Sequence, residues 1–74
     1  MEPVGAVFRR HRDDRGLTQE EFATLVGARQ ADVSRLERGQ GRFRADTLLK
    51  WCRALELTDE QRSEILRLIE QQAA

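Results

Sequence analysis

The sequence predicts an all-α fold, a compact bundle of five helices. Apolar residues recur every three or four positions in five successive stretches, the spacing that places them on one side of a helix. Glycines or capping motifs separate these stretches. The chain has 74 residues, of which 39% are hydrophobic and only one is proline. A chain of this length forms a single domain, here residues 1–74, and needs nearly every apolar stripe for its core.

The first helix is expected from about Val4 to Arg15, where Gly16 ends it as a left-handed cap. Thr18 and Glu21 then form a Thr-x-x-Glu capping box, which marks the start of a second helix. The residues expected to face the core from these segments are Val7, Phe8, His11, Leu17, Phe22, Ala23, Leu25 and Val26.

Two further helices are predicted in the middle of the chain. Gly27 and Gly39 bound the first of them, over about Gln30–Arg38, and the second covers about Ala45–Leu55. The residues expected to face inward are Val33 and Leu36 in the first, and Leu48, Leu49, Cys52 and Leu55 in the second.

The last helix is predicted from Thr58, which forms a second capping box with Gln61, to about Gln71. Its apolar band is too wide for one short helix on so small a body to bury completely. Part of the band is therefore expected to form an interface between two copies of the chain. The residues of this expected dimer interface are Ile65, Leu66, Leu68 and Ile69.

The chain carries no net charge, with 13 basic and 13 acidic residues, but their distribution is uneven. Residues 9–53 contain 11 basic and 7 acidic side chains, whereas residues 54–74 contain 2 and 5. Salt screens charges beyond about 10 Å, so a local basic surface is enough to attract phosphate. The charge pattern therefore allows a nucleic-acid partner on the first part of the chain.

Several classes of protein are disfavoured by what the sequence lacks. No segment approaches the ~20 apolar residues of a membrane span, and the N-terminus lacks the basic region of a secretory signal, so a cytoplasmic location is expected. The single Cys52 and single His11 provide neither an internal disulfide nor a ligand set for zinc. No nucleophile, base and orienting group can be assembled, so we expect neither an enzyme nor a cofactor. Trp51 and Cys52 are expected to pack in the core.

Residues 18–38 form two short amphipathic helices joined at Gly27 in this prediction. That arrangement is typical of a helix-turn-helix unit. The polar side of its second helix can lie in the major groove of DNA, while the apolar side packs on the first helix. The pattern predicts a DNA-binding domain.

The chain from Phe8 to about Leu57 resembles helix-turn-helix proteins of the lambda-repressor, Cro and XRE type. The resemblance depends on an ordered combination of segments: Gly16 to Ala23 (GLTQEEFA), Ser34 to Gly39 (SRLERG), and the Thr-Leu-Leu that begins at Thr47. It implies a bundle of four or five helices, usually dimeric, that binds operator DNA as a transcriptional regulator. It also implies an ion pair between Arg12 and Glu37 that ties the first helix to the end of the third.

Two positions depart from the pattern of these proteins. Arg29 stands where the third helix usually opens with Ser or Thr, and Phe43 and Arg44 stand where the fourth often opens with Pro-Ser. Each exchange removes a side-chain cap worth about 1 kcal/mol and puts arginine where phosphates would pass. The exchange either adapts the protein to DNA or leaves both helices capped by water.

The third helix is expected to read bases. With Val33 and Leu36 against the body, side chains three and four apart share the outer side. Glutamine can pair with adenine and arginine with guanine, each contributing about 1–3 kcal/mol of discrimination. Asp32 is expected to stabilise the first turn through the helix dipole, with cytosine recognition as the alternative. The predicted base contacts are Gln30, Ala31, Ser34 and Arg35.

Phosphate contacts are expected on both sides of this helix. Unpaired amides at the start of the second helix attract anions, and the arginines beyond the third helix are positively charged. The alternatives are that these arginines are solvated or paired with nearby carboxylates, or that Arg42 or Arg44 enters a narrow minor groove. The predicted phosphate contacts are Thr18, Gln19, Arg29, Arg38, Arg42 and Arg44.

These observations favour a transcriptional regulator, a dimeric repressor or autoregulator whose third helix enters the major groove of a palindromic operator. Two subunits are needed because one recognition helix discriminates poorly against a genome of competing sites. The alternative is a protein-interaction module, such as an antitoxin or adaptor, whose last helix binds a protein partner and whose DNA binding is secondary. The absence of net charge keeps this alternative open.

Overall fold

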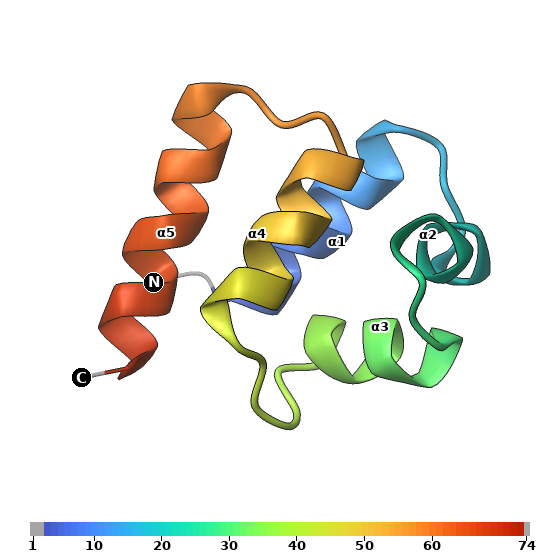
Figure 1. Cartoon of the computed structure of the whole chain (residues 1–74), viewed down its shortest axis with the longest axis horizontal. Coiled ribbons are helices and arrows are strands. Elements are labelled where there is room, and N and C mark those ends of the chain that lie inside the picture. The colour runs from blue at the N-terminus through green and yellow to red at the C-terminus, as the bar shows by residue number, and fades with distance from the viewer. Residues whose placement is uncertain (1–2, 74) are drawn as a thin grey trace.

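The computed structural model describes residues 3–73, which form five α-helices and no strand. The helices are α1 (Val4–Asp14), α2 (Gln19–Val26), α3 (Gln30–Glu37), α4 (Ala45–Ala54) and α5 (Asp59–Ala73) (Figure 1). The prediction of an all-α bundle of five helices is confirmed. None of these helices is long and apolar enough to cross a bilayer.

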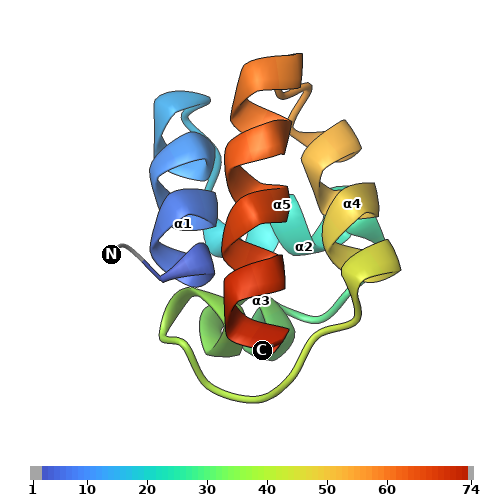
Figure 2. The same cartoon turned by 90° about the vertical axis from the view of Figure 1, so that its left-hand side faces the viewer.

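Helices α1, α4 and α5 form one group, and α3 lies at an angle to it (Figures 1 and 2). α5 packs against α1 and α4 and stands between them in Figure 2. α3 lies across one end of this group, where it packs on α1 and α2 (Figures 1 and 2). One long side of α3 therefore faces away from the rest of the molecule.

Both predicted capping boxes are present. The Thr18 hydroxyl accepts a hydrogen bond from the Glu21 amide at 3.0 Å, and the Thr18 amide donates to the Glu21 carboxylate at 2.9 Å. These bonds lower the pKa of Glu21. At the start of α5, Thr58 and Gln61 exchange the same two bonds at 3.0 and 3.1 Å. Each box satisfies amides that a helix start leaves unpaired.

α3 and α4 begin with arginine, and neither arginine side chain caps its helix because a guanidinium has no acceptor. Acidic residues in the first turn supply acceptors instead. Asp32 accepts from the Arg29 amide at 3.4 Å, and Asp46 accepts from the Thr47 amide at 2.9 Å. The two unusual helix starts therefore have protein acceptors and do not depend on water alone.

Trp51 lies at the centre of the core, where its indole contacts three phenylalanine rings. The ring centroids are 6.3 Å from Phe8, 5.5 Å from Phe22 and 5.8 Å from Phe43. Cys52 beside it is also buried, and burial raises the pKa of its thiol to about 11. The prediction that Trp51 and Cys52 pack in the core is confirmed.

Two predicted core residues lie outside the core. Leu49 of α4 is partly exposed and does not belong to the core cluster, and Leu25 is 56% exposed. The buried side of α2 is formed by Phe22, Ala23 and Val26, which point in neighbouring directions around the helix axis. Leu25 lies outside that sector. The apolar pattern of α2 therefore contains one residue more than its single contact face can cover.

Gly5 lies where α1 crosses the end of α3, a contact that the sequence did not suggest. A methyl group at this position would collide with the backbone carbonyl of Leu36. Gly5 is buried, and only a residue without a side chain allows this close approach. It therefore sets the position of α3 relative to α1.

Candidate nucleic-acid interface

The outer side of α3 carries the residues predicted to contact bases. Val33 and Leu36 are 0% and 4% exposed, so they fix the inner side of the helix against the core. Gln30, Ala31 and Arg35 are exposed on the other side, and Ser34 is partly exposed. The four predicted base contacts thus share the side of α3 that faces away from the bundle.

The turn between α2 and α3 is made by Gly27, whose φ of 72° lies in the left-handed region that favours glycine. The Gly27 and Ala28 amides donate to carbonyls of the last turn of α2. A left-handed cap with these bonds ends the helix sharply. It leaves only Ala28 and Arg29 to lead into α3.

Arg12 and Glu37 form a buried ion pair at the end of α3, behind its exposed side. Arg12 Nε and Nη2 donate to the two Glu37 oxygens at 2.7 and 2.9 Å, and the side chains are 9% and 3% exposed. The hydrogen bonds to Glu37 raise the pKa of Arg12. The pairing that the resemblance implied is the one that the structure contains.

Two further bonds extend this pair. Arg12 Nη1 donates to the Leu17 carbonyl at 2.7 Å, and Gln19 Nε2 donates to Glu37 Oε1 at 3.0 Å. The cluster of Arg12, Glu37 and Gln19 therefore joins α1, the start of α2 and the end of α3. Gln19 was expected at a phosphate, but its amide group has this internal partner, which sequence reasoning missed.

The predicted phosphate contacts lie at the ends of α2 and α3 and in the following loop. Thr18 is exposed at the start of α2, and the side chains of Arg29 and Arg44 are 83% and 85% exposed. Arg29 and Arg44 each have a carboxylate partner on the surface, Asp32 at 3.4 Å and Asp46 at 3.3 Å. Exposed pairs contribute little to stability, so a phosphate can compete for these arginines.

The two remaining arginines lie after the end of α3, Arg38 immediately and Arg42 in the loop that follows. Arg38 Nε donates to the Ser34 carbonyl at 3.3 Å, and Arg42 is exposed. Arg42 and Arg44 belong to the loop formed by residues 39–44. Phe43, between them, is partly buried against Trp51 and anchors this loop to the core. Phe43 was not among the predicted site residues, although an aromatic residue between two arginines was a usable signal.

The predicted dimer interface needs a correction. Ile65 is 0% exposed and Leu68 is 9% exposed, because both pack in the core of their own chain. They are therefore not available to a second chain, and their assignment to the interface was wrong. Leu66 and Ile69 remain partly exposed. The apolar band of α5 is wide because α1 and α4 flank the helix on two sides (Figure 2).

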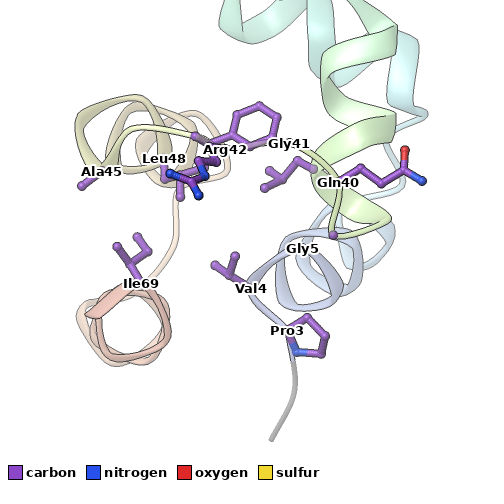
Figure 3. Close-up of a pocket in the computed structure, with 12 residues that line it drawn as sticks. Pro3, Val4, Gly5, Gln40, Gly41, Arg42, Ala45, Leu48 and Ile69 are labelled. Carbon is purple, nitrogen blue, oxygen red and sulfur yellow. The ribbon is translucent and has the colours of Figure 1, made fainter. Parts of the chain in front are cut away.

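Ile69 also borders a groove of about 740 Å³ between the start of α1, the later part of α5 and the loop 39–44. Val4 and Ile69 lie on opposite sides of this groove, and Arg42 lies near its loop side (Figure 3). Apolar and polar groups line it together. From α5, the lining of the groove includes Ile69 and not Leu66.

The order of helices, the glycine turn and the exposed third helix define a helix-turn-helix protein. Residues 3–65 match the sequence profile of a family described as helix-turn-helix domain. The chain belongs to this family, and the resemblance to lambda-repressor, Cro and XRE proteins is confirmed. The class is that of DNA-binding regulators and not of enzymes.

Two solved structures are similar to this chain. The clp gene regulator ClgR from C. glutamicum has a TM-score of 0.75 and 28% sequence identity, over 96% of this chain and 88% of ClgR. The restriction-modification controller protein C.Esp1396I has a TM-score of 0.75 and 23% identity, over 92% of this chain and 90% of the controller. The second likeness shows the fold alone. No curated protein is significantly similar to the chain in sequence.

Proposed function

We propose that this protein is a sequence-specific transcriptional regulator that acts as a dimer. Each subunit places α3 in the major groove of one half of a palindromic operator, and the bound dimer represses a promoter, its own included, by occluding it. The observation that carries this proposal is that α3 exposes a polar side while Val33 and Leu36 on its opposite side are buried in the core. A helix presented in this way fits the width of the major groove.

The base contacts follow from the chemistry of the exposed side chains. The Gln30 amide can pair with adenine, and the Arg35 guanidinium can pair with guanine O6 and N7. Ala31 offers a methyl group that can contact thymine, and Ser34 offers a hydroxyl that either donates or accepts. These side chains lie on a helix of eight residues, which suits a half-site of a few base pairs.

The phosphate contacts would come from both flanks of α3. Thr18 and Gln19 lie at the start of α2, where the helix dipole favours an anion. Since the Gln19 side chain donates to Glu37, the backbone amide of Gln19 is the group that we assign to the phosphate. Arg29 precedes α3, and the arginines at positions 38, 42 and 44 follow it. Contacts of this kind fix the register of the protein on DNA, while the base contacts determine the sequence.

We propose a dimer because the base contacts of a single α3 helix are too few to distinguish one site from all the competing sites in a genome. The exposed parts of Leu66 and Ile69 and the adjoining groove are the surface that we assign to pairing. The two half-sites would then lie about 34 Å apart, one helical turn of DNA from centre to centre. ClgR is described as a gene regulator, which supports this class of function.

A gel mobility shift in rising salt tests the proposal against the alternative of a protein-interaction module. Each phosphate neutralised by an arginine releases counterions and steepens the fall of log affinity with log salt, so the four arginine contacts in each subunit predict a slope several times that of a single ion pair. Arg42→Ala should lower the slope by about one for each subunit, since it removes one phosphate contact. Arg53→Ala, in the last turn of α4, is the matched control and should leave the slope unchanged. No shift for the unaltered protein at low salt would contradict the proposal.

A further inference from the structure

The carboxylate of Asp32 stands between the two arginines on the exposed side of α3. Its Oδ2 atom is 3.4 Å from Arg29 Nε and also accepts from the Arg29 amide at 3.4 Å. Its Oδ1 atom is 3.5 Å from Arg35 Nη1. The side chain of Asp32 is 25% exposed, so the carboxylate is partly shielded, whereas that of Arg35 is 46% exposed.

Gly41 lies on another side of the Arg35 guanidinium. The Gln40 amide donates to the Arg35 carbonyl at 2.8 Å, which folds the loop 39–44 back over the end of α3. A Cβ atom at Gly41 would lie 2.6 Å from Arg35 Nη2 and 3.4 Å from its Cζ. Because Gly41 has no side chain, the Arg35 guanidinium can occupy this space.

These contacts restrict Arg35 more than Arg29, although both arginines share the Asp32 carboxylate. The Arg35 side chain is 46% exposed against 83% for Arg29, and only Arg35 is also enclosed by Gly41. An unrestrained arginine samples many rotamers and is attracted to any phosphate within reach. A neighbouring carboxylate partly cancels that general attraction and repels the phosphate backbone. Discrimination between sites depends on a difference of affinities, and a repulsive group that weakens every unwanted contact increases it.

We infer that Asp32 is a specificity-determining residue: together with Gly41 it holds the Arg35 guanidinium toward a base edge and away from the phosphates. Asp32 is thus a positioning residue that acts through Arg35, and the inference rests on the proposed function. Its ligand class is a guanine edge in the major groove, because the planar fork of arginine matches O6 and N7. The bond from the Arg29 amide keeps the carboxylate in place for this role.

The test uses selection of bound duplexes from random DNA by the whole protein. Asp32→Asn should lower the base preference about tenfold at the one position in each half-site that Arg35→Ala also erases, and affinity for random DNA should rise. Adding Asp32→Asn to Arg35→Ala should cause no further loss of preference. Asp46→Asn is the matched control: it removes the same charge beside Arg44 and should leave every base preference intact.

A second pair of variants separates positioning from a general effect on folding. Gly41→Ala should lower the same preference as Asp32→Asn, because the new methyl group displaces the guanidinium. Gly39→Ala, at the same left-handed φ but with open space around it, should not. In the free protein, ¹⁵N relaxation at Arg35 Nε should report an ordered side chain that becomes mobile in Asp32→Asn and not in Asp46→Asn.

A mobile Arg35 in the unaltered protein would overturn the inference without reference to DNA. So would an Asp32→Asn protein that selects the same sites as the unaltered one, or one that loses preference at all positions equally. Failure of the unaltered protein to select any sequence would contradict the proposed function itself. The two failures are therefore distinguishable.

Discussion

The guanidinium of Arg12 and the carboxylate of Glu37 are joined by two parallel hydrogen bonds of 2.7 and 2.9 Å, and both side chains are buried. The pair connects α1 to the last residue of α3, and the two residues are 25 positions apart in sequence. Glu37 also accepts from Gln19, so a single carboxylate holds three helices in register. The position of the exposed side of α3 depends on this arrangement, since it fixes one end of the helix.

Glu37→Ala should lower the free energy of unfolding by about 3–5 kcal/mol, because it removes the buried carboxylate from a buried charge. Arg12 then keeps only the Leu17 carbonyl at 2.7 Å and the exposed Asp13 carboxylate at 3.3 Å. Replacing Arg12 by Met and Glu37 by Leu together should cost less, since no buried charge then remains. Chemical denaturation of both variants checks this expectation. Equal losses in the single and double variants would contradict it.

His11 should make the protein less stable in mild acid. Burial, followed by the charges of Arg10 and Arg15, lowers its pKa, while Glu64 and Asp14 oppose the shift. Both ring nitrogens are buried and have no hydrogen-bond partner among the described residues. The folded state thus takes up a proton at His11 only at lower pH than the unfolded chain, in which the imidazole titrates at about pH 6.5.

The contribution of His11 to the free energy of unfolding should therefore be constant above about pH 6.5. It should fall as the pH drops below that value. Denaturation curves between about pH 5 and 7.5 measure the slope. His11→Leu should flatten it by removing the titrating group. An unchanged slope in that variant would show that other groups cause the acid sensitivity.

Gly5→Ala should destabilise the protein although alanine is the better helix former. The gain in helix propensity is about 1 kcal/mol, but the methyl group meets a backbone carbonyl that cannot move aside cheaply. Overpacking typically costs about 1–3 kcal/mol and occasionally more, which outweighs the gain where the obstacle is backbone. Ala6→Gly, at the next position of the same helix, should cost about 1 kcal/mol through propensity alone.

DNA affinity separates the two variants further. In Gly5→Ala it should also fall, because α3 must shift to relieve the contact with Leu36. The Ala6→Gly protein should bind DNA normally under conditions where it is folded. A Gly5→Ala protein with unaltered stability and affinity would refute the close approach.

Phe43→Ala should weaken binding to DNA in general, and it should also lower the base preference set by Arg35, because Gly41 lies in the same loop. The ring lies 5.8 Å from that of Trp51, and its loss frees the loop that carries Arg42 and Arg44. Stability should fall by about 3 kcal/mol or less, since Phe43 is only partly buried. Trp51 is the only tryptophan, so its fluorescence reports the change directly. An Arg44→Ala variant should weaken binding without altering that fluorescence.

The parts of the fold that could be predicted are those set by local sequence. The two capping boxes and the left-handed glycines depend on residues three or four positions apart, and they lie where expected. Arg12 and Glu37 were paired through a resemblance and not through spacing. Local rules could not have joined two residues so far apart in sequence.

The errors arose where the arrangement of helices decides the outcome. Leu25 is exposed and Ile65 is buried, and only the number of neighbouring helices distinguishes these two apolar residues. Gly5 looked like an unremarkable helix residue until α3 was placed against it. Apolar periodicity alone contains none of this information. The contact between Asp32 and Arg35, in contrast, joins residues three apart on one helix, so helical spacing allows it. The interpretation of Asp32 as a stabiliser of the first turn agrees with its bond from the Arg29 amide.

The central claim is that α3 reads bases through Gln30 and Arg35. Selection of bound sites from random duplexes, with the unaltered protein and with Gln30→Ala, Arg35→Ala and Arg42→Ala, tests it most directly. We predict a palindromic site in which each of the first two variants relaxes one position per half-site, while Arg42→Ala weakens all sequences alike. Sites without symmetry would contradict the dimer, and an unchanged preference in both α3 variants would contradict the claim.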